Sequence, residues 1–145
     1  MIISKLDAAR VQLDRAIECF FNDDHICAVT LGGAAEDLLA GLLIAPGEQD
    51  PFHFLHDWYQ QTYKTTIKEK DFSRQVANLA RNWLKHAKHD PQDKYDITPK
   101  DSLSMLMRAV PCYKKLTGEH TYQMDRFFHY VQTVPIRFIA NHEFG

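Results

Sequence analysis

Apolar residues recur three and four positions apart along most of the chain, which is the spacing that places side chains on one face of an α-helix. Residues 4–21 show the pattern most clearly, with Leu6, Ala9, Leu13 and Phe20 in phase and charged residues between them. The pattern predicts four main helices, over residues 4–21, 25–45, 72 to 86 or 89, and 98–118.

Capping residues and helix breakers mark the ends of these helices. Residues 22–24, Asn-Asp-Asp, are good N-cap residues for the second helix, and Asp71 is a candidate cap for the third. Pro91 is expected to end the third helix. The fourth begins sharply at residues 98–101, because Thr-Pro-Lys-Asp combines a cap, a proline in the first turn and an acid at the third position. A kink is expected near Pro111.

Two further stretches complete the predicted architecture. Residues 51–64 are rich in aromatic side chains and predict a shorter helix, and residues 122–134 predict a C-terminal helix. No stretch alternates convincingly over six residues, so strands are not expected. We therefore predict an all-α chain, a single domain over residues 1–145 that forms an up-down helical bundle of four main helices plus the short helix and the C-terminal helix. The core is expected over about residues 4–117, with the C-terminal helix and tail at 119–145.

The composition is that of an ordinary globular protein. The chain has 145 residues, of which 45% are hydrophobic and 25% are charged, and its net charge is −2. Nucleic-acid binding would therefore need a local basic patch. Three cysteines, Cys19, Cys27 and Cys112, fit neither a disulfide framework nor a zinc motif. No signal peptide is recognised, and Glu36 and Asp37 interrupt the longest apolar stretch, so a cytoplasmic protein without membrane contact is expected.

One segment of the chain separates positive from negative charge. Residues 72–89 contain no Asp or Glu. The basic residues and histidines of the segment are Arg74, Arg81, Lys85, His86, Lys88 and His89. Such a patch attracts phosphate groups electrostatically. The alternative is a solvated helix face whose acidic partners lie on neighbouring helices.

Within this segment, residues 81–86 read Arg-Asn-Trp-Leu-Lys-His. This run resembles the core motif of the HEPN superfamily, Arg-Asn-x-x-x-His. The octapeptide Gly-Gly-Ala-Ala-Glu-Asp-Leu-Leu at 32–39 and the run Asn-Trp-Leu-Lys-His-Ala-Lys-His-Asp-Pro at 82–91 are similar to bacterial members of the group. The resemblance covers about residues 4–117. It implies a helical bundle that dimerises and that, in many members, is a metal-independent endoribonuclease serving as a toxin or defence component.

The motif residues suit RNA cleavage by attack of the 2′-hydroxyl group. His86 can act as general acid or base, because histidine titrates near neutral pH. Arg81 stays charged and can hold the oxygens of the phosphorane, while Asn82 can bind phosphate or orient the imidazole. The residues expected to contact RNA are Arg74, Lys85, Lys88 and His89.

Helix geometry constrains this site. Arg81 and His86 are five positions apart, or about 140° around a continuous helix, so the two side chains would not share a face. Asn82 and His86, four positions apart, would share one. Either the helix ends near His86, or a second copy of the chain completes the site across a two-fold axis, which is the option that the resemblance favours.

The second helix carries two unusual features. Gly32 and Gly33 lie in its middle, where each costs about 1 kcal/mol relative to alanine. The expected compensation is close approach of another helix, either from the same chain or from a partner subunit. One acid of the pair Glu36 and Asp37 is expected to face inward, and Glu36 either pairs with Arg81 to hold it in place or is an ordinary exposed acid.

Two pairs of histidines occur at the i, i+3 spacing at which they can share a metal, provided that a carboxylate joins them. They are His53 with His56, and His86 with His89. Surface histidines are the simpler interpretation, so neither a metal nor another cofactor is expected.

The function expected from these residues and from the resemblance is a homodimeric, metal-independent endoribonuclease, with a separately encoded antitoxin as partner if it acts as a toxin. Two alternatives use the same residues. One is a non-catalytic module that binds RNA or nucleotides through the basic patch. The other is a dimerisation module in which Arg81 and His86 are structural.

Overall fold

The computed structural model describes residues 1–44, 51–87 and 93–133. All regular structure in these residues is helical, which confirms the all-α class. In chain order the elements are α1 (Lys5–Phe21), α2 (His25–Leu43), α3 (Pro51–Tyr63), α4 (Glu69–Phe72), the π-helical segment η1 (Ser73–Ala77), α5 (Leu79–Lys85), α6 (Pro99–Thr117) and α7 (Tyr122–Thr133).

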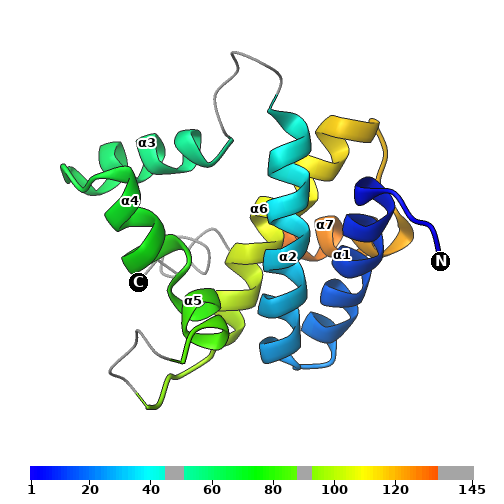
Figure 1. The fold of residues 1–145 in the computed structure, drawn as a ribbon, viewed down its shortest axis with the longest axis horizontal. Coiled ribbons are helices and arrows are strands. Elements are labelled where there is room, and N and C mark those ends of the chain that lie inside the picture. Colours follow the sequence, from blue (N-terminus) through cyan, green and yellow to red (C-terminus); the bar gives the residue numbers. More distant parts are fainter. Residues whose placement is uncertain (45–50, 88–92, 134–145) are drawn as a thin grey trace.

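The helices group around a central pair. Figure 1 shows α2 and α6 in the middle of the molecule, with α1 and α7 on one side and α3, α4 and α5 on the other. The short connection between α1 and α2 makes these two helices antiparallel neighbours. This arrangement leaves α5, which carries the Arg-Asn-x-x-x-His motif, packed against α2.

The hydrophobic core lies between α1, α2, α6 and α7. Its fully buried side chains include Leu13 of α1, Leu39 of α2, Leu106 of α6 and Met124 of α7. Burying each of these side chains stabilises the fold by roughly 1.5–3 kcal/mol. Because Met124 and Phe127 belong to the same cluster, the C-terminal helix packs on its own chain.

Local capping chemistry sets most helix ends where the sequence predicts them. The Ser4 hydroxyl accepts the backbone N–H of Asp7 at 3.0 Å, and an Asp24 carboxylate oxygen accepts that of Cys27 at 3.1 Å. The start of α6 forms the predicted capping box, and its C-cap Gly118 adopts a φ of 75°. The helix continues through Pro111, which lies on its exposed side. The predicted ends of α1, α2 and α6, the C-terminal end of α3 and the N-terminal end of α7 are confirmed to within two residues.

The third main helix is not the single helix predicted over residues 72 to 86 or 89. Regular structure begins earlier, at α4, so Asp71 lies inside that helix and Lys68 occupies the N-cap position. A π-helical segment follows, and the helix breaks at Asn78 before α5 begins. The end of α5 at Lys85 precedes Pro91, so the proline does not set it.

Backbone and side-chain hydrogen bonds stabilise the break between η1 and α5. The backbone N–H of Asn78 donates to the Ser73 carbonyl at 2.9 Å, five residues earlier, which closes the π turn. Arg108 of α6 then donates to the Ala77 carbonyl at 3.0 Å and to Asn78 Oδ1 at 2.9 Å. An arginine from another helix therefore satisfies the carbonyl that the interrupted helix leaves without a partner.

Among the described helices, α2 is the one long and apolar enough to cross a membrane by length and composition, with a mean hydropathy of 1.6. This is weak support for a membrane span, because the core helix of a soluble protein has the same properties. The packing of α2 against α1 and α6, and the burial of its Glu36, are those of a core helix.

Candidate functional site

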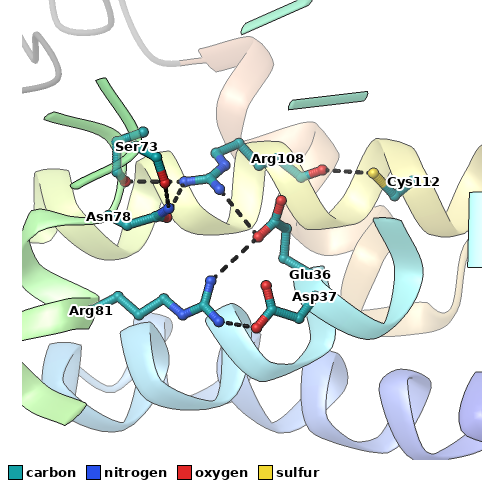
Figure 2. Close-up of polar contacts among 8 residues, drawn as sticks. Glu36, Asp37, Ser73, Asn78, Arg81, Arg108 and Cys112 are labelled. Atoms are coloured by element: carbon teal, nitrogen blue, oxygen red, sulfur yellow. Dashed lines mark hydrogen bonds and ion pairs between the residues drawn. The ribbon is translucent and has the colours of Figure 1, made fainter. Parts of the chain in front are cut away.

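A buried carboxylate ties the motif helix to the rest of the bundle. Glu36 points inward from α2, and its side chain is only 8% exposed. Figure 2 shows that it lies between two arginines, with Oε2 3.7 Å from Arg81 of α5 and 3.1 Å from Arg108 of α6. The predicted pairing of Glu36 with Arg81 is therefore confirmed. One carboxylate joins three helices through this network.

Arg81 has a second acidic partner at the protein surface. Its Nη2 atom donates to a carboxylate oxygen of Asp37, the next residue on α2. The Arg81 side chain is 14% exposed, whereas that of Asp37 is 58% exposed. The guanidinium is thus held by one buried and one exposed carboxylate, and an incoming anion can displace only the exposed one without leaving a buried charge unpaired.

Arg108 is the member of this network that the sequence analysis missed. Besides Glu36 and the break at Asn78, its guanidinium lies 5.3 Å from the centre of the Phe52 ring. The sequence pattern that could have identified Arg108 is its position beside the apolar stripe of α6, next to the buried residue Ala109. A cation at that position needs a buried acid nearby, and Glu36 supplies it.

The two central glycines of α2 make room for its neighbours within the same chain. A Cβ atom on Gly33 would lie 2.9 Å from Cδ of Arg81, and one on Gly32 would lie 3.2 Å from Cγ of Met105. The predicted close approach of another helix is confirmed, with α5 and α6 as the helices concerned. These glycines therefore need no partner subunit to explain them.

Gly33→Ala is expected to lower the free energy of unfolding by about 1–2 kcal/mol, because the added methyl group overpacks the Arg81 stem, whose two ends are fixed by α5 and by the ion pairs. Gly41→Ala is the matched control, since a Cβ there meets nothing within 4 Å. The control should stabilise the protein by about 0.5–1 kcal/mol through helix propensity. Urea denaturation measures both. Equal stabilisation by the two variants would contradict the close packing of Arg81 on Gly33.

Two clefts adjoin Arg81. The larger, with a volume of about 360 Å³, lies between α2 and α5 and is lined by Thr30, Ala34, Asp37, Arg81, Leu84 and Lys85. The smaller, of about 220 Å³, is partly lined by Tyr95, whose hydroxyl donates to Asp101 at 3.3 Å. Burial, together with the nearby Asp101 carboxylate, raises the pKa of Tyr95 to about 12. The phenol therefore stays protonated at neutral pH and serves as a hydrogen-bond donor rather than a base.

The motif histidine occupies the exposed end of α5. His86 is the C-cap, with a φ of −126°, and its backbone N–H donates to the Asn82 carbonyl at 3.0 Å. The helix therefore ends near His86, which is the first of the two alternatives that its geometry left open. Arg81 lines both clefts, whereas His86 lines neither of them. Within one chain, the two side chains therefore do not meet in either cleft. Asn82 is half-buried.

The other residues that were predicted to contact RNA differ in their surroundings. Lys85 is exposed, lines the larger cleft and makes no ion pair with any residue in the described ranges. Arg74 is exposed and pairs with Asp71 at 3.6 Å, one turn earlier. Acids on neighbouring segments thus neutralise Arg74 and Arg81, as the alternative interpretation of the basic segment expects. Lys88 and His89 lie outside the described residues.

Comparison with family models, with curated proteins and with solved structures found no match to this chain.

Proposed function

We propose that this chain is a HEPN-like, metal-independent endoribonuclease whose site is completed in a homodimer. The observation that supports this most is the chemistry at the end of α5. There His86 and Lys85 are exposed, Asn82 lies one turn earlier, and a cleft large enough for a nucleotide fragment adjoins Lys85 and Arg81. No acid lies within residues 72–89, so the helix itself offers no repulsion to phosphate.

The proposed reaction needs two proton transfers. A base removes the proton from the 2′-hydroxyl group while its oxygen attacks phosphorus, and an acid protonates the departing 5′-oxygen as the P–O5′ bond breaks. The products are a 2′,3′-cyclic phosphate and a 5′-hydroxyl end. One chain supplies one His86, and a two-fold axis supplies the second imidazole. The need for an acid and a base is the chemical reason for proposing a dimer.

Arg81 has a defined role in this proposal. Glu36 anchors one side of the guanidinium inside the bundle, while the exposed Asp37 occupies the other side. A phosphate oxygen of RNA replaces Asp37 at Nη2, and Glu36 keeps the guanidinium in position. Asp37 thus competes with the substrate for Arg81.

Asp37→Asn is accordingly expected to tighten RNA binding by roughly two- to fivefold at low salt, because it removes an exposed charge that both repels phosphate and occupies Arg81. Fluorescence anisotropy with a labelled single-stranded RNA measures the Kd. Asp125→Asn, on α7, is the matched control, because its side chain is as exposed as that of Asp37, and it should leave the Kd unchanged. Equal or weaker binding of RNA by Asp37→Asn would count against Arg81 as a phosphate contact.

The function itself is tested with the purified full chain, EDTA and a mixed-sequence RNA. The proposal expects cleavage products that end in a cyclic phosphate. Binding without cleavage, with an affinity that falls steeply as salt rises, would instead identify a non-catalytic RNA-binding module. If neither binding nor cleavage is observed and His86→Ala lowers Tm, the result favours the dimerisation module in which Arg81 and His86 are structural.

One observation favours the non-catalytic alternatives. Two carboxylates already neutralise Arg81, and the side chain is largely buried, which is the arrangement of a structural arginine. In that case the motif residue fixes α5 on α2, and RNA or nucleotides contact only the exposed residues at the helix end. A cytoplasmic location is proposed for each of these functions, whereas a toxin-like role with a separately encoded antitoxin belongs to the nuclease proposal alone.

A further inference from the structure

Helix α3 carries a cluster of histidines and carboxylates that the proposed RNA site does not use. His53, His56 and Asp57 lie at positions i, i+3 and i+4 and therefore share one side of the helix. Each offers one ligand atom, and the three atoms lie within 4.8 Å of one another. Glu69, at the start of α4, adds a second carboxylate, with Oε2 2.8 Å from His53 Nδ1 and 3.9 Å from His56 Nδ1.

His56 is the most informative member of this cluster. Its side chain is only 8% exposed, and its Nε2 atom lies 2.7 Å from the carbonyl oxygen of Ile67. Because a carbonyl oxygen can only accept, Nε2 carries the hydrogen, and Nδ1 of the neutral ring holds the lone pair. This Nδ1 atom is buried and has no hydrogen-bond partner among the described residues. A buried nitrogen acceptor without a hydrogen-bond partner lowers the stability of the fold unless a ligand binds to it.

The contacts around both rings are those that orient metal-binding histidines. Such a histidine binds the metal through one ring nitrogen and donates the other N–H to a carbonyl or carboxylate oxygen. His56 makes this second contact with Ile67. His53 lies between two carboxylates, with Nδ1 2.8 Å from Glu69 and Nε2 3.6 Å from Asp57, so whichever nitrogen binds a metal, the other keeps an acceptor.

We propose that His53, His56 and Asp57 of α3 bind one zinc ion, with Glu69 of α4 as the hydrogen-bond acceptor for the other ring nitrogen of His53. Two imidazoles and one carboxylate are ligands that zinc accepts, and water fills the fourth position of its tetrahedral shell. Zinc holds its ligand atoms about 3.4 Å apart at bond lengths near 2.1 Å. His53 Nε2 lies 3.6 Å from a carboxylate oxygen of Asp57, and the ligand atoms of His53, His56 and Asp57 all lie within 4.8 Å of one another, so rotation of the partly exposed His53 and Asp57 side chains closes the site.

The proposed role of the ion is to fix the His53 ring, whose other nitrogen contacts Glu69, and so to hold α3 against α4. Helix α4 leads through η1 into α5, so the ion would fix the helices that precede the motif helix. The metal takes no part in the proposed cleavage, which proceeds in EDTA. The two proposals can therefore fail independently.

The test uses the tag-free full chain, stripped of metal with a chelator that is then removed. Calorimetric titration with zinc alone should give one ion per chain with a micromolar or tighter Kd, and cobalt should give the intense visible absorption of a tetrahedral complex. A hundredfold excess of zinc over Kd should raise Tm by roughly 5–10 °C. His53→Gln and His56→Gln should each weaken binding about 100-fold or more, since loss of even an outer contact costs about 10–100-fold.

Two controls locate the ion. His120→Gln removes another histidine–carboxylate contact, that of His120 with Asp125 at 3.1 Å, and His86→Gln disrupts the second pair of histidines at metal-binding spacing. Both should bind zinc as the unmodified chain does. His53 is half-exposed, so His53→Gln should stay folded by circular dichroism even if His56→Gln does not. Failure to bind zinc at millimolar concentration, or undiminished binding by His53→Gln, would overturn the proposal, as would an equal loss in a control.

Discussion

Glu36→Ala is expected to lower the free energy of unfolding by about 3–5 kcal/mol, the largest stability change we anticipate for a single residue. The carboxylate bridges Arg81 and Arg108, whose side chains are 14% and 9% exposed. Its removal leaves two largely buried cations close together without their shared counter-ion. Because the three residues come from α2, α5 and α6, the loss also loosens the packing of the motif helix. Urea denaturation at neutral pH measures the change.

Asp37→Ala is the matched control for this prediction. It removes the neighbouring carboxylate from the same arginine, but that carboxylate is exposed, so the expected loss is less than about 1 kcal/mol. Glu36→Gln keeps the shape of the side chain and removes only its charge, and it should fall between the two. Similar small losses for Glu36→Ala and Asp37→Ala would show that the buried ion pairs do not hold the helices together.

The sequence predicts helix ends well where a nearby residue determines them. Ser4, Asp24, Thr98 and Gly118 each act within one turn of the end that they set, so their chemistry is visible in a short stretch of sequence. The break at Asn78 is different, because it depends on Arg108, which lies thirty positions later. No local pattern contains that information, and the continuous apolar spacing predicts an unbroken helix.

The same distinction between nearby and distant residues applies to the candidate site. The pair Glu36 and Asp37 among apolar neighbours indicated that one acid faces inward, and pairing of Glu36 with Arg81 was one of the two alternatives for Glu36. The second arginine and the carbonyl contact of His56 follow from how α6 and the segment before α4 fold back on the chain. Spacing along one helix cannot predict such contacts, since they join elements that are distant in sequence.

His86→Ala is expected to reduce RNA cleavage by about 100-fold or more, the usual contribution of a general acid or base. Its effect on stability should be small, because the side chain is exposed and the backbone N–H that donates to the Asn82 carbonyl remains. His129→Ala removes an exposed histidine from α7 and is the matched control, with no expected change in cleavage. A fall in Tm with no change in cleavage would instead assign His86 a structural role.

The most direct test compares cleavage of one labelled RNA, in EDTA, by equal concentrations of the unmodified chain, His86→Ala and His129→Ala. We predict that the unmodified chain and His129→Ala cleave at the same rate and leave a 2′,3′-cyclic phosphate, while folded His86→Ala cleaves about 100-fold more slowly or not at all. Cleavage by His86→Ala at the rate of the unmodified chain, or an unmodified chain that leaves the RNA intact, would contradict a catalytic site at the end of α5.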